Sequence, residues 1–147
     1  MPFVKNEYTV LLVDDENDIL DFLSYTLEKE GYKVFTADNG KEGIKLAKNI
    51  SPDLIILDVM MPNIDGIEAC QMIRNDHQID QPIIAFLTSR SEDYSQIAGL
   101  EAGADDYITK PIRPRLLASK VESLLRRVSE TAINKDRSDI QIDREKY

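Results

Sequence analysis

The run Leu54-Ile55-Ile56-Leu57-Asp58 joins four consecutive aliphatic residues to an acidic one. A continuous aliphatic run of this length is typical of a β-strand that is covered on both faces, because a strand with one exposed face alternates apolar and polar residues. Two further runs have the same form, at residues 10–13 before Asp14-Asp15 and at residues 83–87 before Thr88. Each run predicts a buried strand that ends at a polar residue.

Weaker strand patterns occupy residues 33–37 and 106–109, and helical patterns separate all five predicted strands. The five predicted helices are a segment striped by Ile19, Phe22, Leu23, Thr26 and Leu27, one capped by Asn39, one striped by Ile67, Cys70 and Ile73, one over residues 92–102, and one that starts at Pro114. Alternation of this kind is typical of an α/β fold. We therefore expect a doubly wound, five-stranded parallel sheet flanked by five helices.

Composition restricts the protein class. The chain has 147 residues, 42% of them hydrophobic, which suits one globular domain. A single cysteine excludes an intramolecular disulfide. The net charge of −9 disfavours direct contact of this chain with nucleic acid, and no segment approaches the ~20 apolar residues of a membrane span. These properties predict a cytoplasmic protein that has no membrane partner.

Ligands of open α/β sheets bind beyond the carboxyl ends of the strands, so the residues at those ends are the candidate functional residues. They include the carboxylates of Asp14, Asp15 and Asp58. At an effective dielectric constant near 20, two such charges about 4 Å apart repel by about 4 kcal/mol, so a cation is needed among them. We expect Mg²⁺, with Asp15 and Asp58 as direct ligands, Asp14 acting through water, and the Met60 carbonyl as a further ligand.

Lys110 ends the last predicted strand and supplies a second positive charge. A carboxylate beside Mg²⁺ and a lysine can attack phosphorus and form an aspartyl phosphate. Asp58 is the preferred nucleophile, and the Thr88 hydroxyl could bind a phosphoryl oxygen. An Asp-Asp pair after a strand is more often a helix-capping feature, and a lysine is more often a surface charge. Their joint occurrence at neighbouring strand ends favours the functional interpretation.

Four motifs together resemble the receiver domain of bacterial two-component response regulators, which has a flavodoxin/CheY-like fold. They are Val13-Asp14-Asp15-Glu16, the segment from Leu57 to Gly66 (LDVMMPNIDG), Leu87-Thr88-Ser89, and the segment from Gly103 to Pro111 (GADDYITKP). The last motif and Leu-Leu-Arg-Arg at residues 124–127 are most similar to the OmpR/PhoB subfamily. The resemblance implies a receiver domain over residues 1–127. Residues 128–147 would then form a linker and the possible start of a C-terminal winged-helix DNA-binding domain missing from this chain.

The resemblance also implies residue roles. Asp58 would accept the phosphoryl group from a sensor histidine kinase, Asp14 and Asp15 would bind Mg²⁺, and Lys110 would contact the phosphoryl group. Thr88 and Tyr107 would form the conformational switch. The surface that responds usually forms a two-fold dimer, here with the charged residues Asp105, Asp106, Lys120, Arg126 and Arg127. Gln96 and Leu116 depart from the charge pattern of that surface.

Three functions remain open at this point. The first is the signalling domain of a transcription regulator that contacts DNA only through the missing C-terminal domain. The second is a stand-alone receiver that acts by protein–protein contact or in a phosphorelay. The third, an enzyme such as a phosphatase, is disfavoured because no insertion is long enough to form a substrate cap. We therefore expect no enzymatic activity beyond the chain's own Mg²⁺-dependent phosphotransfer and dephosphorylation.

Overall fold

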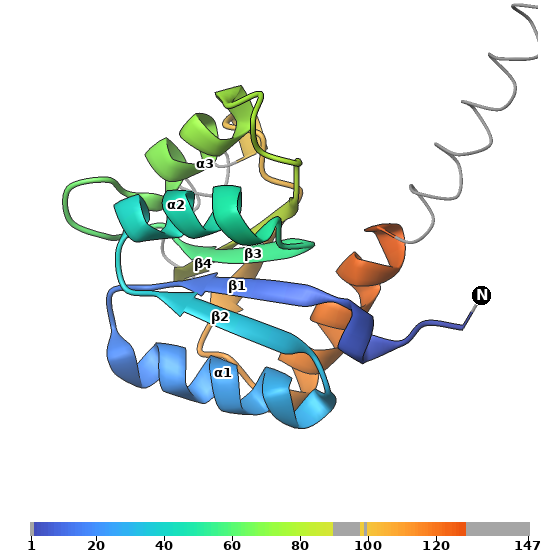
Figure 1. Ribbon diagram of the computed structural model, residues 1–147. Helices are drawn as coiled ribbons and strands as arrows, with labels where there is room; N and C mark the ends of the chain where they lie inside the picture. The colour runs from blue at the N-terminus through green and yellow to red at the C-terminus, as the bar shows by residue number, and fades with distance from the viewer. Residues whose placement is uncertain (1, 90–97, 99, 129–147) are drawn as a thin grey trace, which may run out of the picture.

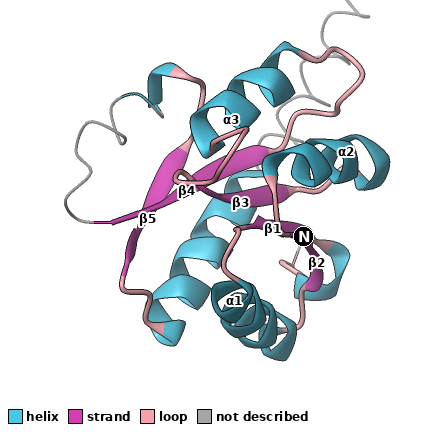
Figure 2. Cartoon of the chain, turned by 90° about the vertical axis from the view of Figure 1, so that its left-hand side faces the viewer, coloured by secondary structure: helices cyan, strands magenta, loops and turns pink. Residues whose placement is uncertain are grey.

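The computed structural model describes residues 2–89, 98 and 100–128, and its centre is one parallel β-sheet (Figure 1). The strands lie in the order β2-β1-β3-β4-β5, with bounds β1 Thr9–Val13, β2 Lys33–Ala37, β3 Leu54–Asp58, β4 Ile83–Ser89 and β5 Asp106–Lys110. All four pairings are parallel. The strand order makes β2 and β5 the edge strands (Figure 2). The predicted sheet and its five strands are confirmed.

Helices cover both faces of the sheet (Figure 1). Helix α1 (Asn17–Glu30) and the helix over residues 114–128 pack against one face, and α2 (Gly40–Ile50) and α3 (Gly66–Asn75) pack against the other. Successive side chains of β1 and β3 enter the two cores in turn: Leu12 and Ile56 face α1, whereas Leu11 and Ile55 face α2 and α3. Both faces are therefore dry, which explains why these strands are aliphatic throughout.

The helix boundaries follow local signals in the sequence. The Asn39 side chain accepts a hydrogen bond from the Glu42 amide at 2.9 Å and caps α2, as predicted. Asp65 caps α3 in the same way, through a 2.8 Å bond from the Glu68 amide. Helix α1 ends at Gly31, whose φ of 107° lies in the left-handed region that favours glycine. Local hydrogen bonding thus defines where these elements begin and end.

The predicted apolar stripe of α1 is wrong at one position. Phe22 is 36% exposed, and Leu20, which the stripe omitted, is buried beside Leu23 and Leu27. Leu20 and Leu27 are seven residues apart and lie on the same side as Leu23, whereas Phe22 lies about 100° around the axis from Leu23. Thr26 is buried as expected, and its hydroxyl donates to the Phe22 carbonyl at 2.8 Å.

Part of the predicted architecture lies outside the described residues. Of the helix expected over 92–102, the structure describes residues 98 and 100–102, and residues 98, 100 and 101 are helical. Gln96 and residues 129–147, with the proposed linker and second domain, also lie outside the described part. Within the described residues, we find no helix with the length and apolar character needed to cross a bilayer.

Candidate functional site

Four polar side chains meet at the carboxyl edge of the sheet. Asp14 follows β1, Asp58 is the last residue of β3, Thr88 lies near the end of β4, and Lys110 ends β5. Asp14, Asp58 and Thr88 are almost fully buried, with exposed fractions of 1%, 3% and 1%. Because β1, β3, β4 and β5 are parallel neighbours, their ends bring together residues nearly one hundred positions apart in the sequence.

Lys110 joins the two buried carboxylates. Its ammonium nitrogen Nζ lies 3.5 Å from Oδ1 of Asp58 and 4.0 Å from Oδ2 of Asp14. One partly exposed lysine thus faces two acids that have little contact with water. The prediction that Asp14, Asp58 and Lys110 share one site is confirmed by these distances.

The two buried carboxylates, Asp14 and Asp58, repel each other. The pKa of Asp58 is raised from 3.8 to about 7, chiefly by burial and next by the neighbouring Asp14 charge, whereas the Lys110 ammonium opposes the rise. Burial also raises the pKa of Asp14, although the Glu16 amide donates a 2.9 Å hydrogen bond to its Oδ1. One lysine therefore does not compensate both acids, and the site favours binding of further positive charge.

A second observation indicates where that charge could bind. Oδ2 of Asp14 is buried and has no hydrogen-bond partner among the described residues. Carboxylate oxygens of Asp14, Asp15 and Glu16 all lie within 4.8 Å of one another. An oxygen-rich, partly exposed cluster with one buried oxygen that accepts no hydrogen bond within the described residues suits a hard divalent cation such as Mg²⁺. Glu16 is not among the predicted metal ligands, and its signal in the sequence is the acidic run Asp14-Asp15-Glu16.

For the other predicted metal ligands, Asp15, Asp58 and Met60, the structure gives weaker support. Asp15 is exposed, yet it is close enough to Asp58 to raise the pKa of that carboxyl. Asp58 does not belong to the close cluster of Asp14, Asp15 and Glu16. Met60 follows β3 with a 65% exposed side chain, and its carbonyl as a ligand remains a prediction.

The loop after Asp58 turns sharply into α3, and Gly66 makes that turn possible. The Gly66 amide donates to the Val59 carbonyl at 2.9 Å. A Cβ atom at this position would collide with the Asp58 carbonyl oxygen and lie 2.9 Å from the Val59 Cα. Both obstacles are backbone atoms of the strand end that carries the candidate nucleophile, so neither can move without displacing it.

Gly66→Ala is therefore expected to lower the free energy of unfolding by about 3 kcal/mol, because overpacking against backbone forces the chain to shift. Urea unfolding would measure this loss. Gln71→Ala, on the exposed side of the same helix, serves as the control and should change stability by less than about 0.5 kcal/mol. Equal stability of the two variants would contradict the close approach of Gly66 to β3.

The two predicted switch residues lie on neighbouring strands. Thr88 is buried in β4, and its hydroxyl donates to the Ser89 carbonyl at 3.3 Å. Tyr107, on β5, is 36% exposed. It lines a hollow between β5 and the helix over 114–128, together with Ile112 and Leu116. The exposed ring is the starting state that the predicted switch requires, and its movement stays a prediction.

Most of the charged residues predicted to form a dimer face have partners within the chain. Lys120 pairs with Asp106 at 3.2 Å, and Arg126 pairs with Glu122 at 3.6 Å. The Arg126 guanidinium also lies 4.8 Å from the centre of the Phe3 ring. Asp105 pairs with Arg74 at 2.9 Å. Arg74 is not among the residues predicted from the sequence. Arg127 lines a separate groove that also contains Asp105 and Arg74.

Comparisons with known proteins agree with this geometry. A family model described as response regulator receiver domain matches residues 10–122. The chain is 48% identical over 118 residues to the alkaline phosphatase synthesis transcriptional regulatory protein PhoP of Bacillus subtilis, covering 80% of this chain and 48% of PhoP. It is 44% identical to the transcriptional regulatory protein AfsQ1 of Streptomyces coelicolor, covering 81% of this chain and 52% of AfsQ1.

The fold has matches among solved structures. The crystal structure of a CheY-like response regulator receiver domain protein from Methanospirillum hungatei superposes with a TM-score of 0.78 at 30% identity, covering 84% of this chain and 98% of that one. The chain thus matches nearly all of that structure but spans about half the length of the curated relatives it matches.

Proposed function

The chain belongs to the response regulator receiver domain family, and on that basis we propose that it accepts a phosphoryl group on Asp58 from a sensor histidine kinase. The observation that carries this proposal is the buried Asp58 carboxylate, 3.5 Å from the Lys110 ammonium and beside a second buried acid, Asp14. In a simple ion pair, one acid faces one base. This site has an excess of carboxylates, which suits an incoming cation and phosphoryl group.

The proposed metal is Mg²⁺, held by Asp14 and Asp15 with Asp58 and the Met60 carbonyl as further ligands. Oδ2 of Asp14, which accepts no hydrogen bond within the described residues, and the cluster with Glu16 support this assignment. Bound Mg²⁺ would neutralise carboxylate charge and stabilise the negative charge on the transferring phosphoryl oxygens. Because the pKa of Asp58 is about 7 without metal, a proton competes with the cation for the same carboxylate.

In the transfer step, a carboxylate oxygen of Asp58 forms a bond to phosphorus while the phosphorus–nitrogen bond of the donor phosphohistidine breaks. The bonding pair stays on the imidazole nitrogen, and a proton already on the ring or taken from solvent leaves the donor histidine neutral. Lys110 lies where its charge can oppose the charge on the phosphoryl oxygens. The chain's residues thus bind and orient the group, and we propose no enzymatic activity beyond this transfer and the later hydrolysis of the aspartyl phosphate, which releases inorganic phosphate.

The aspartyl phosphate would alter the same contacts that hold the pocket. A phosphoryl group brings extra negative charge and three strong acceptors, which compete for the Lys110 ammonium and the Thr88 hydroxyl. Thr88 pairs with Thr109 in the register of β4 and β5, and Tyr107 lies two residues earlier on β5. Movement of Thr88 toward the phosphate would therefore change the surroundings of Tyr107. We propose that the Tyr107 ring then turns inward.

We propose control of transcription as the output. PhoP and AfsQ1 are transcriptional regulators about twice as long as the matched region, so a DNA-binding domain after this receiver is the interpretation we favour. A stand-alone receiver remains the alternative. We further propose a homodimer of the phosphorylated form. The hollow beside Tyr107 and the 64% exposed Leu116 supply apolar surface for it, next to the Asp106–Lys120 pair.

Mg²⁺-dependent labelling by acetyl phosphate tests the proposed function. The wild-type protein should take up one phosphoryl group with Mg²⁺ and none with EDTA, as measured by intact mass. Asp15→Asn should raise the Mg²⁺ concentration needed for half-maximal labelling by at least about tenfold, because it removes a metal ligand. Asp21→Asn, an exposed acid of α1, is the matched control. Labelling that is independent of Mg²⁺ would contradict the proposal.

A further inference from the structure

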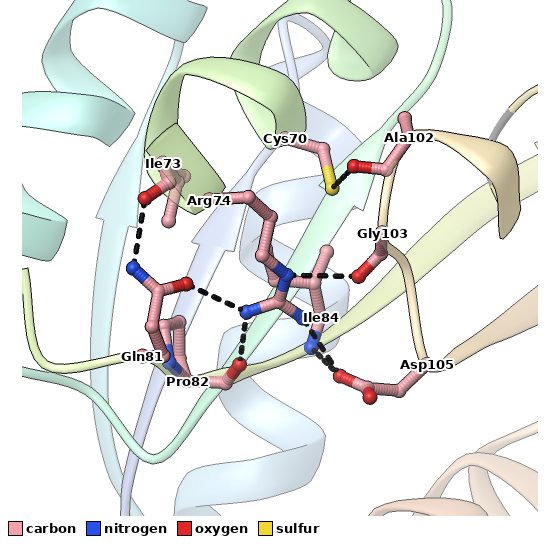
Figure 3. Close-up of polar contacts among 9 residues, drawn as sticks. All are labelled: Cys70, Ile73, Arg74, Gln81, Pro82, Ile84, Ala102, Gly103 and Asp105. Carbon is pink, nitrogen blue, oxygen red and sulfur yellow. Dashed lines mark hydrogen bonds and ion pairs between the residues drawn. The ribbon is translucent and has the colours of Figure 1, made fainter. Parts of the chain in front are cut away.

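Arg74, in the last turn of α3, ties three chain segments together (Figure 3). Its Nε donates to the Gly103 carbonyl at 2.8 Å. Its Nη1 donates to the Pro82 carbonyl at 2.7 Å and to Oε1 of Gln81 at 3.0 Å. Its Nη2 donates to Oδ2 of Asp105 at 2.9 Å. All three guanidinium nitrogens are engaged, which only an arginine can achieve at one position.

Asp105 links Arg74 to the β-sheet. Its Oδ2 accepts a second hydrogen bond, at 2.9 Å, from the Ile84 amide, and its own amide donates to the Ile84 carbonyl at 2.8 Å. These bonds stand immediately before the ladder that pairs Asp106 with Ala85 and, at its far end, Lys110 with Ser89. Asp105 therefore fixes the start of β5 against β4, and Arg74 fixes Asp105.

Besides these bonds, β5 is located by its five-residue ladder with β4 and by the Asp106–Lys120 ion pair. β5 is an edge strand, so it pairs with β4 alone. Ile108 is its single buried residue. The central strand β3, in contrast, is buried at every position and pairs on both sides. With one neighbouring strand and one buried residue, β5 has fewer constraints than β3, so the contacts at its ends add to the ladder in fixing its position along β4.

The loop that enters β5 is fitted closely to Arg74. Gly103 has a φ of 105°, in the left-handed region, and a Cβ atom there would lie 3.0 Å from Cγ of Arg74. Gly103 thus lets its carbonyl approach the guanidinium while the backbone turns toward Asp105. The loop and the arginine are thus in close contact at the amino ends of β4 and β5, opposite the candidate phosphorylation site.

From these contacts we propose that Arg74 is a positioning residue for Lys110. It binds Asp105 and Gly103, fixes β5 along β4, and so sets the distance between the Lys110 ammonium and Asp58, at the other end of the strand. The proposal rests on the proposed function, because it gives Lys110 a role in phosphoryl transfer. The Lys110 ammonium lies 3.5 Å from the Asp58 carboxylate and 4.0 Å from that of Asp14, so a small displacement of β5 would break these ion pairs.

The test compares Arg74→Met in two backgrounds, the wild-type chain and Lys110→Met, using the rate of labelling by acetyl phosphate with saturating Mg²⁺. In the wild-type background we expect the rate to fall about tenfold, because small displacements of a charge-stabilising group lower transfer rates steeply. In the Lys110→Met background we expect no further loss, because the group that Arg74 positions is already absent. Arg74→Lys should restore only part of the rate, since one nitrogen cannot replace three donors.

Gln81→Ala is the matched control. It removes one acceptor of Arg74 and a 2.9 Å bond to the Ile73 carbonyl, but leaves the bonds to Asp105 and Gly103 intact. It should destabilise the same corner of the molecule without changing the labelling rate. Thermal unfolding of each variant confirms that the folded protein is being compared, and Arg74→Lys replaces Arg74→Met if the latter does not fold.

The outcomes separate the two hypotheses. Equal losses from Arg74→Met in both backgrounds would show a general structural role and overturn the positioning role. A rate equal to that of Gln81→Ala in the wild-type background would overturn it as well. If the wild-type protein itself takes up no phosphoryl group, it is the proposed function that fails, whatever Arg74 does.

Discussion

Asp58→Asn is expected to abolish the uptake of phosphate from acetyl phosphate in the presence of Mg²⁺. The amide is nearly the same size as the carboxylate, but its oxygen is a poor nucleophile and it cannot form an acyl phosphate. Of the two buried carboxylates that face Lys110 in the described part of the chain, Asp58 is the nearer, at 3.5 Å against 4.0 Å for Asp14, so the initial labelling rate should fall by at least about a thousandfold. Intact mass measured over a time course gives the rate.

Two controls accompany this prediction. Asp21→Asn removes an exposed acid of α1 and should label at the wild-type rate. Circular dichroism of Asp58→Asn should match the wild type, because the side chain is isosteric and its neighbours need not move. An Asp58→Asn variant that still acquires a phosphoryl group at the wild-type rate would show that the nucleophile has been assigned wrongly.

The same substitution is expected to stabilise the metal-free protein. The pKa of Asp58 is about 7 in the folded chain and 3.8 when unperturbed, so the folded state binds a proton more tightly than the unfolded state. Stability from this group is therefore complete below about pH 4 and is lost as the pH rises through about 7. At pH 8, Asn in place of the ionised Asp58 should raise the free energy of unfolding by about 2–4 kcal/mol.

Urea unfolding in EDTA at pH 5 and pH 8 measures this effect. The wild-type protein should lose stability between the two pH values, and Asp58→Asn should lose much less, with a remainder from Asp14, whose pKa is also raised by burial. Asp21→Asn should follow the wild type. Identical pH dependence of the wild type and Asp58→Asn would contradict the account of a strained acidic pocket.

Most of the fold could be predicted because its central strands have an unambiguous pattern. The aliphatic runs that became β1, β3 and β4 lie between two helical layers, so both faces of each strand require apolar residues. The stripe of α1 was harder. Phe22 is as apolar as Leu20, and only packing against the sheet reveals that the leucine is buried and the aromatic ring is partly exposed.

Some residues of the candidate site could likewise be predicted from the sequence, whereas the residue proposed to position Lys110 could not. Asp14, Asp58 and Lys110 could be identified because parallel strands bring their carboxyl ends together, and a polar residue at the end of an aliphatic run is easy to detect. Arg74 could not be identified. As a basic residue in the last turn of a helix it resembles an ordinary helix-terminal cation, and although its partners Gly103 and Asp105 belong to a recognised motif, nothing in that motif indicates a contact with α3.

Chemical identification of the phosphorylated residue tests the central claim most directly. The protein is labelled with acetyl phosphate and Mg²⁺, reduced with borohydride to convert an acyl phosphate to the corresponding alcohol, digested, and sequenced by mass spectrometry. We predict homoserine at position 58 and unmodified aspartate at positions 14 and 15. Reduction at another carboxylate, or no reduced residue in a protein that has bound Mg²⁺, would contradict the assignment of Asp58 as the phosphoryl acceptor.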